Sequence, residues 1–201
     1  MTRAHTADRI LSAARALFER EGAGAVSMRR VAEAVGITPM AIYRHFPNRD
    51  ALLKRVSDDS FGEIAHRWEA LRSDGDAGSS PGQAPVARLM AIQRIYLDYA
   101  LAHPHLFDHA FSVPRGDARR FPEDFRARRS PTLNVVHDTV VEAQDAGLLR
   151  AGDPWDIAMT LWAQSHGLVA LYRAGRFSYG EREFRIFYDA SIGRLLDGLK
   201  T

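Results

Sequence analysis

The chain has no cysteine among its 201 residues, and this absence excludes a disulfide framework and a thiolate metal site. It also has no apolar run of about 18 residues or more, so we expect no transmembrane helix. The N-terminal stretch is amphipathic and charged throughout, and it lacks the apolar segment and small-residue cleavage site of a secretory signal. We therefore expect a cytoplasmic protein.

Sequence fingerprints of common enzymes are missing as well. There is no GxSxG elbow, no phosphate-binding P-loop and no dinucleotide fingerprint. Ser165 and His166 suggest a hydrolase pair, but adjacent residues on a helix point about 100° apart and cannot form a nucleophile–base pair directly. We expect that the protein is not an enzyme.

Three of the eight histidines, His103, His105 and His109, lie close together, and the last two have the four-residue spacing of helical metal ligands. No HExxH motif and no cysteine assist them. We expect no metal site and no other cofactor; pocket-lining or exposed histidines are the alternative.

The net charge of +2 is unevenly distributed. Residues 1–55 hold ten Lys or Arg and five Asp or Glu, a balance of +5 that leaves −3 for residues 56–201. A basic N-terminal module on a mildly acidic remainder is typical of a DNA-binding head on a regulatory body. A solvated arginine-rich face is the alternative interpretation.

Residues 27–53 contain the pattern of two short helices joined by a tight turn. Ser27 is placed to cap the first helix, and Gly36 stands where a left-handed residue ends it. Thr38 and Pro39 then restart the helix as its cap and first residue. The apolar face of the first helix repeats at i, i+3, i+4 and i+7, in Met28, Val31, Ala32 and Val35. This spacing predicts a helix-turn-helix.

The run ITPMAIYRHFPNRDALL, residues 37–53, resembles the DNA-binding domain of the TetR family of bacterial transcriptional regulators. The similarity covers about residues 7–53. It differs at Pro39 and Met40, where many members have small or polar residues, and at Arg49, where lysine is commoner. The difference at Pro39 and Met40 concerns which bases are read, whereas Arg49 keeps the positive charge of lysine.

The resemblance implies a set of DNA-binding residues. Tyr43, His45 and Arg49 are expected on phosphates, and Ser27 and Arg29 are further phosphate candidates. The residues expected to face bases or the DNA backbone are Thr38, Pro39, Met40 and Arg44. Arg44 can read guanine with two hydrogen bonds or contact phosphate. Packing of Tyr43 and His45 inside the domain is the alternative, and Phe46 is assigned to the core.

No segment alternates at period two, so the predicted fold is all-α with about nine helices. Beyond the helix-turn-helix, the expected helices span residues 7–21, 48–71, 86–102, 104–111, 122–146, 154–174 and 181–199. Residues 73–85 and 113–121 are predicted loops. We expect a DNA-binding domain over residues 1–50 and a ligand-binding and dimerisation domain over residues 51–201.

The stretch TLWAQSHGLVALYRAGRF resembles a recurrent helix of one TetR subfamily, through Trp162, His166 and Gly167. The resemblance implies a largely apolar ligand pocket, with Tyr96, His137 and His166 orienting the ligand. Filling of the core by the same rings is the alternative. The predicted lining residues are Trp68, Tyr96, Phe107, Phe111, Phe125, His137, Trp162, His166 and Tyr172.

The last two long helices are predicted to pair with their copies in a second chain, as a four-helix homodimer interface. Small residues on the first of them, Ala163, Gly167 and Ala170, permit close approach of two backbones. The last helix adds an apolar stripe of Phe184, Phe187, Tyr188, Ile192, Leu195 and Leu199.

The resulting interpretation is a homodimeric repressor that a small organic effector releases from a palindromic operator in double-stranded DNA. An activator is one alternative. A ligand-free architectural DNA-binding protein is another, although such a protein needs little beyond the head.

Overall fold

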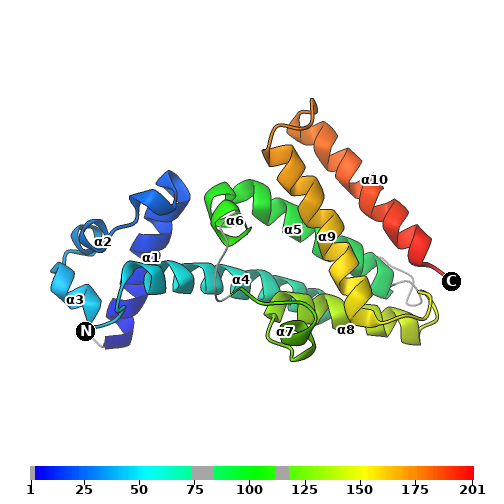
Figure 1. The fold of residues 1–201 in the computed structure, drawn as a ribbon, viewed down its shortest axis with the longest axis horizontal. Helices are drawn as coiled ribbons and strands as arrows, with labels where there is room; N and C mark the ends of the chain where they lie inside the picture. The colour runs from blue at the N-terminus through cyan, green and yellow to red at the C-terminus, as the bar shows by residue number, and fades with distance from the viewer. Residues whose placement is uncertain (1–2, 74–83, 112–117) are drawn as a thin grey trace. The chain divides into compact units, whose positions relative to one another are not determined.

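The structure is a computed structural model that describes residues 3–73, 84–111 and 118–201 (Figure 1). These residues form ten α-helices and one 3-10 helix without a β-strand, which confirms the all-α prediction. The elements are α1 (Arg3–Glu21), η1 (Ala23–Ala25), α2 (Met28–Val35), α3 (Pro39–Tyr43), α4 (Arg49–Ser73), α5 (Ala84–Ala102), α6 (Pro104–Phe111), α7 (Glu123–Arg126), α8 (Pro131–Asp145), α9 (Pro154–Arg173) and α10 (Glu181–Leu199). No helix in the described ranges has the length and apolar character needed to span a bilayer.

The chain divides into two compact units, and α4 and α5 contribute residues to both. The first unit comprises Met1–Phe61 and Ala100–Gly116, and the second comprises Gly62–Tyr99 and Asp117–Thr201.

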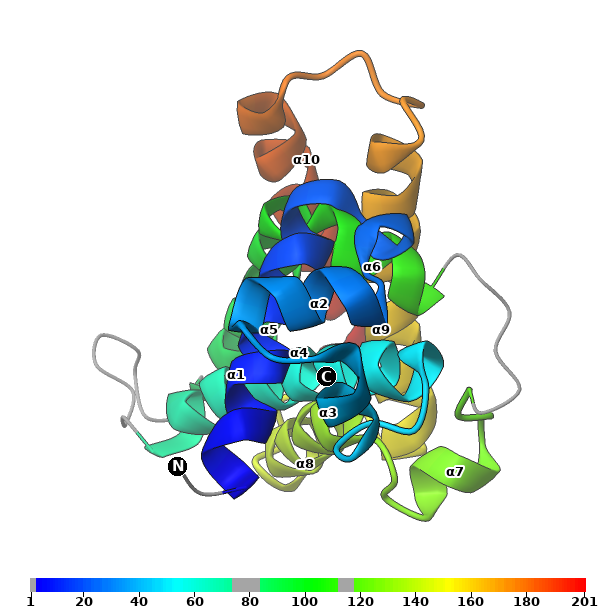
Figure 2. The same cartoon turned by 90° about the vertical axis from the view of Figure 1, so that its left-hand side faces the viewer.

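The first unit has its own apolar core, built by α1 to α4 and α6. Ile10 and Phe18 from α1, Ile42 from α3 and Leu52 from α4 are completely buried in it. Leu106 of α6 joins the same cluster. Figure 2 shows α2 and α3 nearest to the viewer, beside α1. The short α3 is therefore held by a single buried side chain, Ile42.

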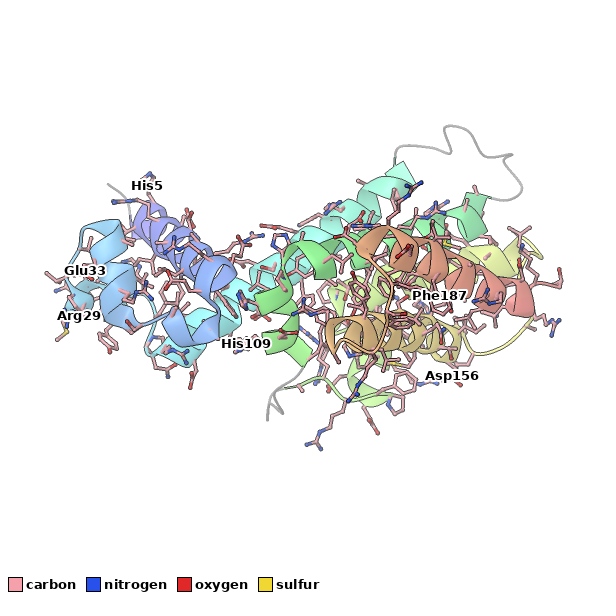
Figure 3. All side chains as sticks on the ribbon, turned by 90° about the horizontal axis from the view of Figure 1, so that it is seen from above. His5, Arg29, Glu33, His109, Asp156 and Phe187 are labelled. Carbon is pink, nitrogen blue, oxygen red and sulfur yellow. The ribbon has the colours of Figure 1, made fainter. Side chains whose placement is uncertain are left out.

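The three candidate metal-binding histidines lie where α6 packs against the end of α1. The ring of His109 meets Phe18 edge-on, with ring centroids 5.2 Å apart (Figure 3). His103 Nδ1 lies 3.2 Å from Glu19 Oε1. Within the described part of the chain, no three His, Cys, Asp or Glu residues gather as a metal site would require.

The second unit is a helical body in which α9 packs against α8 and α10. Figure 1 shows α9 and α10 running side by side. Leu89 and Ile92 of α5 and Phe184, Tyr188 and Ile192 of α10 are completely buried. Of the apolar stripe predicted on the last helix, Phe184, Tyr188 and Ile192 thus face the inside of this unit.

The prediction of one continuous helix over residues 122–146 is wrong. The structure has α7 and α8 instead, separated by Arg128, which takes a left-handed conformation with φ of 57°. Ser130 Oγ accepts a hydrogen bond from the Leu133 amide, and Pro131 is the first residue of α8. A residue before proline disfavours the helical conformation, so the Ser130–Pro131 step begins a helix here.

Several predicted boundaries are confirmed and others shift. α5 ends at Ala102 before Pro104, and Asp153 Oδ1 caps α9 by accepting from the Trp155 amide at 2.9 Å. α1 begins earlier than predicted, and the predicted loop over residues 73–85 overlaps both α4 and α5 at its ends. The centre of that loop, residues 74–83, and residues 113–117 of the second loop lie outside the described residues.

Candidate nucleic-acid interface

The turn between α2 and α3 has the predicted geometry. Ser27 Oγ accepts from the Arg30 amide at 3.2 Å and caps α2. Gly36 ends the helix in the left-handed region, with φ of 72° and ψ of 39°. Thr38 Oγ1 accepts from the Ala41 amide at 3.3 Å, and Pro39 follows as the first residue of α3. These local features confirm the helix-turn-helix.

The recognition helix α3 is exposed on the side opposite Ile42. Met40 is 69% exposed and Tyr43 is 50% exposed, which are high values for large apolar and aromatic side chains. Thr38, Pro39 and Arg44 are exposed as well. Tyr43 therefore does not serve as a core residue. Phe46, at 8% exposure, does belong to the core, as predicted.

Two neighbouring arginines of α2, Arg29 and Arg30, differ in their hydrogen bonds. Arg29 is exposed on the same face of α2 as Glu33 (Figure 3), and it forms no hydrogen bond or ion pair with any residue that the structure describes. The side chain of Arg30 instead donates two hydrogen bonds to the Glu21 carboxylate, with Nη1–Oε2 at 2.8 Å and Nη2–Oε1 at 3.1 Å. Hydrogen bonds from Arg30 and Arg20 lower the pKa of the Glu21 carboxyl to about 2.

Two further arginines donate to backbone carbonyls inside the first unit. Arg9 Nη2 donates to the Val35 carbonyl at 2.6 Å, at the end of α2. Arg49 donates to the carbonyls of Val26 and Ala23, before the start of α2. Sequence reasoning missed these roles of Arg9, Arg30 and Arg49, because no motif marks the partners of these side chains.

The helical body contains a cluster of four predicted ligand-binding residues. Tyr96 Oη lies 3.0 Å from His166 Nδ1. The rings of Trp162 and His166 have centroids 5.9 Å apart, and those of Phe125 and Trp162 are 6.4 Å apart. Burial raises the pKa of the Tyr96 hydroxyl and lowers the pKa of His166. The Tyr96 hydroxyl is therefore neutral and can donate a hydrogen bond to Nδ1 of a neutral His166.

Other residues predicted for the pocket have ring partners outside this cluster. Phe107 and Phe111 belong to the first unit, where their ring centroids lie 5.1 Å apart. The His137 ring stacks on Trp155 at 4.1 Å, and the Tyr172 ring stacks on Phe184 at 4.0 Å.

The polar atoms of His137 and Trp68 form no hydrogen bond with the cluster of Tyr96, Phe125, Trp162 and His166. His137 Nδ1 lies 2.9 Å from Asp138 Oδ1, and Asp138 is held in turn by both terminal nitrogens of Arg128. Trp68 is buried, and its Nε1 has no hydrogen-bond partner among the described residues.

Gln93 is a buried polar residue that sequence reasoning did not select. Ser165 Oγ donates to Gln93 Oε1 at 2.7 Å, and the Tyr188 hydroxyl donates to the Gln93 carbonyl at 2.9 Å. Ser165 and His166 thus have separate partners, in accord with the argument against a nucleophile–base pair. The sequence signal is its spacing, because Gln93 lies on the helical face of the apolar Leu89 and Leu97.

The residues predicted for dimerisation fall into a buried and an accessible group. Phe184, Tyr188 and Ile192 are completely buried within the chain. Ala163 is exposed, and Gly167, Ala170, Phe187, Leu195 and Leu199 are half-buried (Phe187 is labelled in Figure 3). A Cβ built on Gly167 would meet no atom within 4 Å, so the surface beside this glycine is open. Leu171 and Ile186 add exposed aliphatic area to α9 and α10, at 48% and 63% exposure.

The comparisons with known proteins agree with this architecture. Residues 10–56 match the family model of bacterial regulatory proteins of the tetR family, and residues 89–197 match that of the tetracyclin repressor-like C-terminal domain. The chain belongs to the TetR family and is a transcriptional regulator with a DNA-binding helix-turn-helix.

Individual relatives are distant. An HTH-type transcriptional regulator of Saccharopolyspora erythraea is 30% identical over 97 residues, which are 48% of this chain and 38% of that protein. A protein of unknown function from Rhodococcus sp. RHA1 has a similar fold, with a TM-score of 0.77 at 24% identity over 98% of this chain and 96% of the other. A TetR-family transcriptional regulator from Pectobacterium atrosepticum gives a TM-score of 0.73 at 22% identity, over 100% and 98%.

Proposed function

We propose that the protein is a homodimeric repressor that binds a palindromic operator and is released from it by a small organic ligand. The observation that carries the proposal is the recognition helix itself. α3 is anchored by the buried Ile42 and leaves Met40 and Tyr43 exposed beside a capped helix start. A helix in this position commonly enters the major groove. A regulator acting on DNA would work in the cytoplasm, with residues 1–50 as its DNA-binding domain and residues 51–201 as its ligand-binding and dimerisation domain.

The proposed DNA contacts rest on the family resemblance and on the exposure of most of these side chains. Tyr43, His45 and Arg29 would bind phosphates, and Ser27 would add a contact from the start of α2. Thr38, Pro39, Met40 and Arg44 would face the bases or the adjacent backbone. Met40 and Pro39 would provide apolar contact with thymine methyl groups, which lie in the major groove.

The proposed dimer uses the open side of α9 and α10. The exposed Ala163 and the open surface at Gly167 permit two α9 helices to approach closely, with Leu171 and Ile186 completing an apolar patch. Ala170, Phe187, Leu195 and Leu199 would border this patch, while Phe184, Tyr188 and Ile192 would support it from inside each chain. A twofold axis would then set the distance between the two heads.

The proposed ligand site is the cluster of Tyr96, Phe125, Trp162 and His166, with Trp68 as a further buried donor. Its composition, apolar rings with one hydroxyl and one neutral imidazole, suits an apolar molecule with a single polar group. Trp162, His166 and Gly167 are the residues that suggest the subfamily. In some conformations of the dimer, the two DNA-binding domains would have the wrong spacing for the operator. A ligand that binds more tightly to such a conformation would shift the dimer off DNA.

The experiment that tests DNA binding compares variants on a panel of duplexes of different sequence. Tyr43→Phe and His45→Ala should weaken binding to every sequence, whereas Met40→Ala should change the preferred sequence. Affinity should fall with salt at a log–log slope of about −0.9 per phosphate contact. Binding independent of salt, or a Tyr43→Phe/His45→Ala protein with normal affinity, would contradict the proposal.

Ligand release needs its own test. A thermal-shift screen of aromatic and aliphatic compounds should find some that stabilise the protein and release it from DNA, and Trp162→Ala should lose both effects. If no compound does both, the ligand-responsive part of the proposal is wrong even if DNA binding is found.

A further inference from the structure

The connection between α1 and α2, residues 22–27, is held by an arginine from the first residue of α4. Arg49 Nε donates to the carbonyl oxygen of Val26 at 2.7 Å. Its Nη2 donates to the carbonyl oxygen of Ala23 at 2.5 Å. One planar guanidinium thus holds two carbonyls of the same short connection, 23 and 26 residues away in the sequence.

Arg30 of α2 also binds this connection. Arg30 Nη1 donates to the Ala25 carbonyl at 3.1 Å while the guanidinium also binds Glu21. Within this connection the carbonyls of Gly22 and Ala23 accept from the amides of Ala25 and Val26, whereas the carbonyls of Ala25 and Val26 accept from no backbone amide of the described residues. Guanidinium donors satisfy the carbonyls of Ala25 and Val26 and add a second hydrogen bond to that of Ala23, and the fork of an arginine can serve two acceptors at once.

These contacts leave Arg49 poorly placed to bind DNA directly. Two of its three nitrogens already donate to carbonyls, and the third, Nη1, lies 3.7 Å from the carboxylate of Asp50. A phosphate would have to displace those bonds or approach beside a negative charge. Arg29, by contrast, is exposed and forms no bond with the described residues.

We propose that Arg49 is a positioning residue for DNA binding and not a phosphate contact. It ties the start of α4 to the connection that leads into α2, and so fixes where the capped start of α2 and the following α3 stand relative to α4. This inference rests on the proposed DNA-binding function and replaces the direct role that the family resemblance implies at this position.

The salt dependence of DNA binding distinguishes the two roles. The full chain is titrated, at several salt concentrations, against a duplex selected from random sequences by the unaltered protein. Arg29→Met is the matched control and should reduce the steepness of the log–log salt slope by about 0.9, because one phosphate contact is lost. Arg49→Met should weaken binding about tenfold at every salt concentration and leave the slope unchanged, because a conformational loss releases no counterion.

Amide hydrogen exchange of the DNA-free protein gives a second readout. Arg49→Met should speed exchange in α2, and Arg29→Met should not. Arg49→Lys keeps the charge but places all its donors on one nitrogen, so it should restore neither slow exchange nor full affinity. If Arg49→Met does not fold, Arg49→Lys carries the test alone, with faster exchange and an unchanged salt slope expected.

The inference is overturned if Arg49→Met reduces the salt slope by about 0.9 and Arg49→Lys restores affinity with normal exchange. It is also overturned if α2 exchanges at the normal rate in both variants. Failure of the unaltered protein to bind any duplex would instead overturn the proposed function, and the exchange experiment would still decide the role of Arg49.

Discussion

Arg30 and Glu21 join α2 to the end of α1 through two hydrogen bonds, with Nη1–Oε2 at 2.8 Å and Nη2–Oε1 at 3.1 Å. Both side chains are partly exposed, so the pair contributes less to stability than a buried pair would. Its importance lies in geometry, since it fixes α2 beside the connection that Arg49 also holds.

The Glu21 carboxyl gives the first unit a predicted acid dependence. Its pKa is lowered from 4.5 to about 2, so its ion pair stabilises the folded state above pH 4.5 and is lost as the pH falls towards 2. Glu21→Gln should lower the melting temperature near pH 6, and the difference from the unaltered protein should shrink by pH 3. Thermal melts at both pH values check this, and an equal difference at both would contradict it.

His166 should make the helical body sensitive to mild acid. Burial lowers its folded pKa, so the unfolded chain takes up a proton first, at about pH 6.5, and stability falls as the pH drops below that value. His166→Asn retains an acceptor for Tyr96 without a titrating ring. Its melting temperature should vary less between pH 7.5 and pH 5.5 than that of the unaltered protein. Equal changes in the two proteins would rule out His166 as the cause.

Substitution of Thr38 should reveal how much the cap of the recognition helix contributes to the free energy of unfolding. Thr38→Ala removes the oxygen that accepts from the Ala41 amide and should cost about 1 kcal/mol of unfolding free energy. Thr38→Ser keeps the hydroxyl and serves as the matched control. Urea denaturation gives both values. Equal stability of the alanine and serine variants would show that this cap contributes nothing.

The open surface at Gly167 predicts the effect of a large side chain on assembly. Gly167→Trp should leave the fold of one chain intact, because no atom lies within 4 Å of the added Cβ, but should block close approach of two α9 helices. Sedimentation at micromolar concentration should show a dimer for the unaltered protein and mainly monomer for the variant. A normal dimer of Gly167→Trp would contradict the proposed interface, and circular dichroism confirms that the variant is folded.

Local sequence signals predicted much of the fold because their physical causes are local. The caps at Ser27, Thr38 and Asp153 and the left-handed Gly36 each depend on a few neighbouring residues. The predicted continuous helix over residues 122–146 is wrong because the Ser130–Pro131 step begins a new helix. That step was itself a local signal.

Contacts between distant residues were less predictable. Nothing in the sequence near Arg49 shows that its partners are the carbonyls of Ala23 and Val26. The aromatic residues chosen for one pocket share a composition, but tertiary packing places Phe107 in one unit and Trp162 in the other. Periodicity likewise identified the apolar stripe on α10 without showing that Tyr188 is buried within its own chain.

Selection of DNA by the purified protein, from a pool of random duplexes, tests the central claim most directly. The selected sequences should converge on an inverted repeat whose half-site centres lie one helical turn of DNA, roughly 34–36 Å, or a multiple of it apart. The arms of the repeat should change with Met40→Ala. Recovery of no preferred sequence, or of a preferred site without twofold symmetry, would contradict a homodimeric operator-binding repressor.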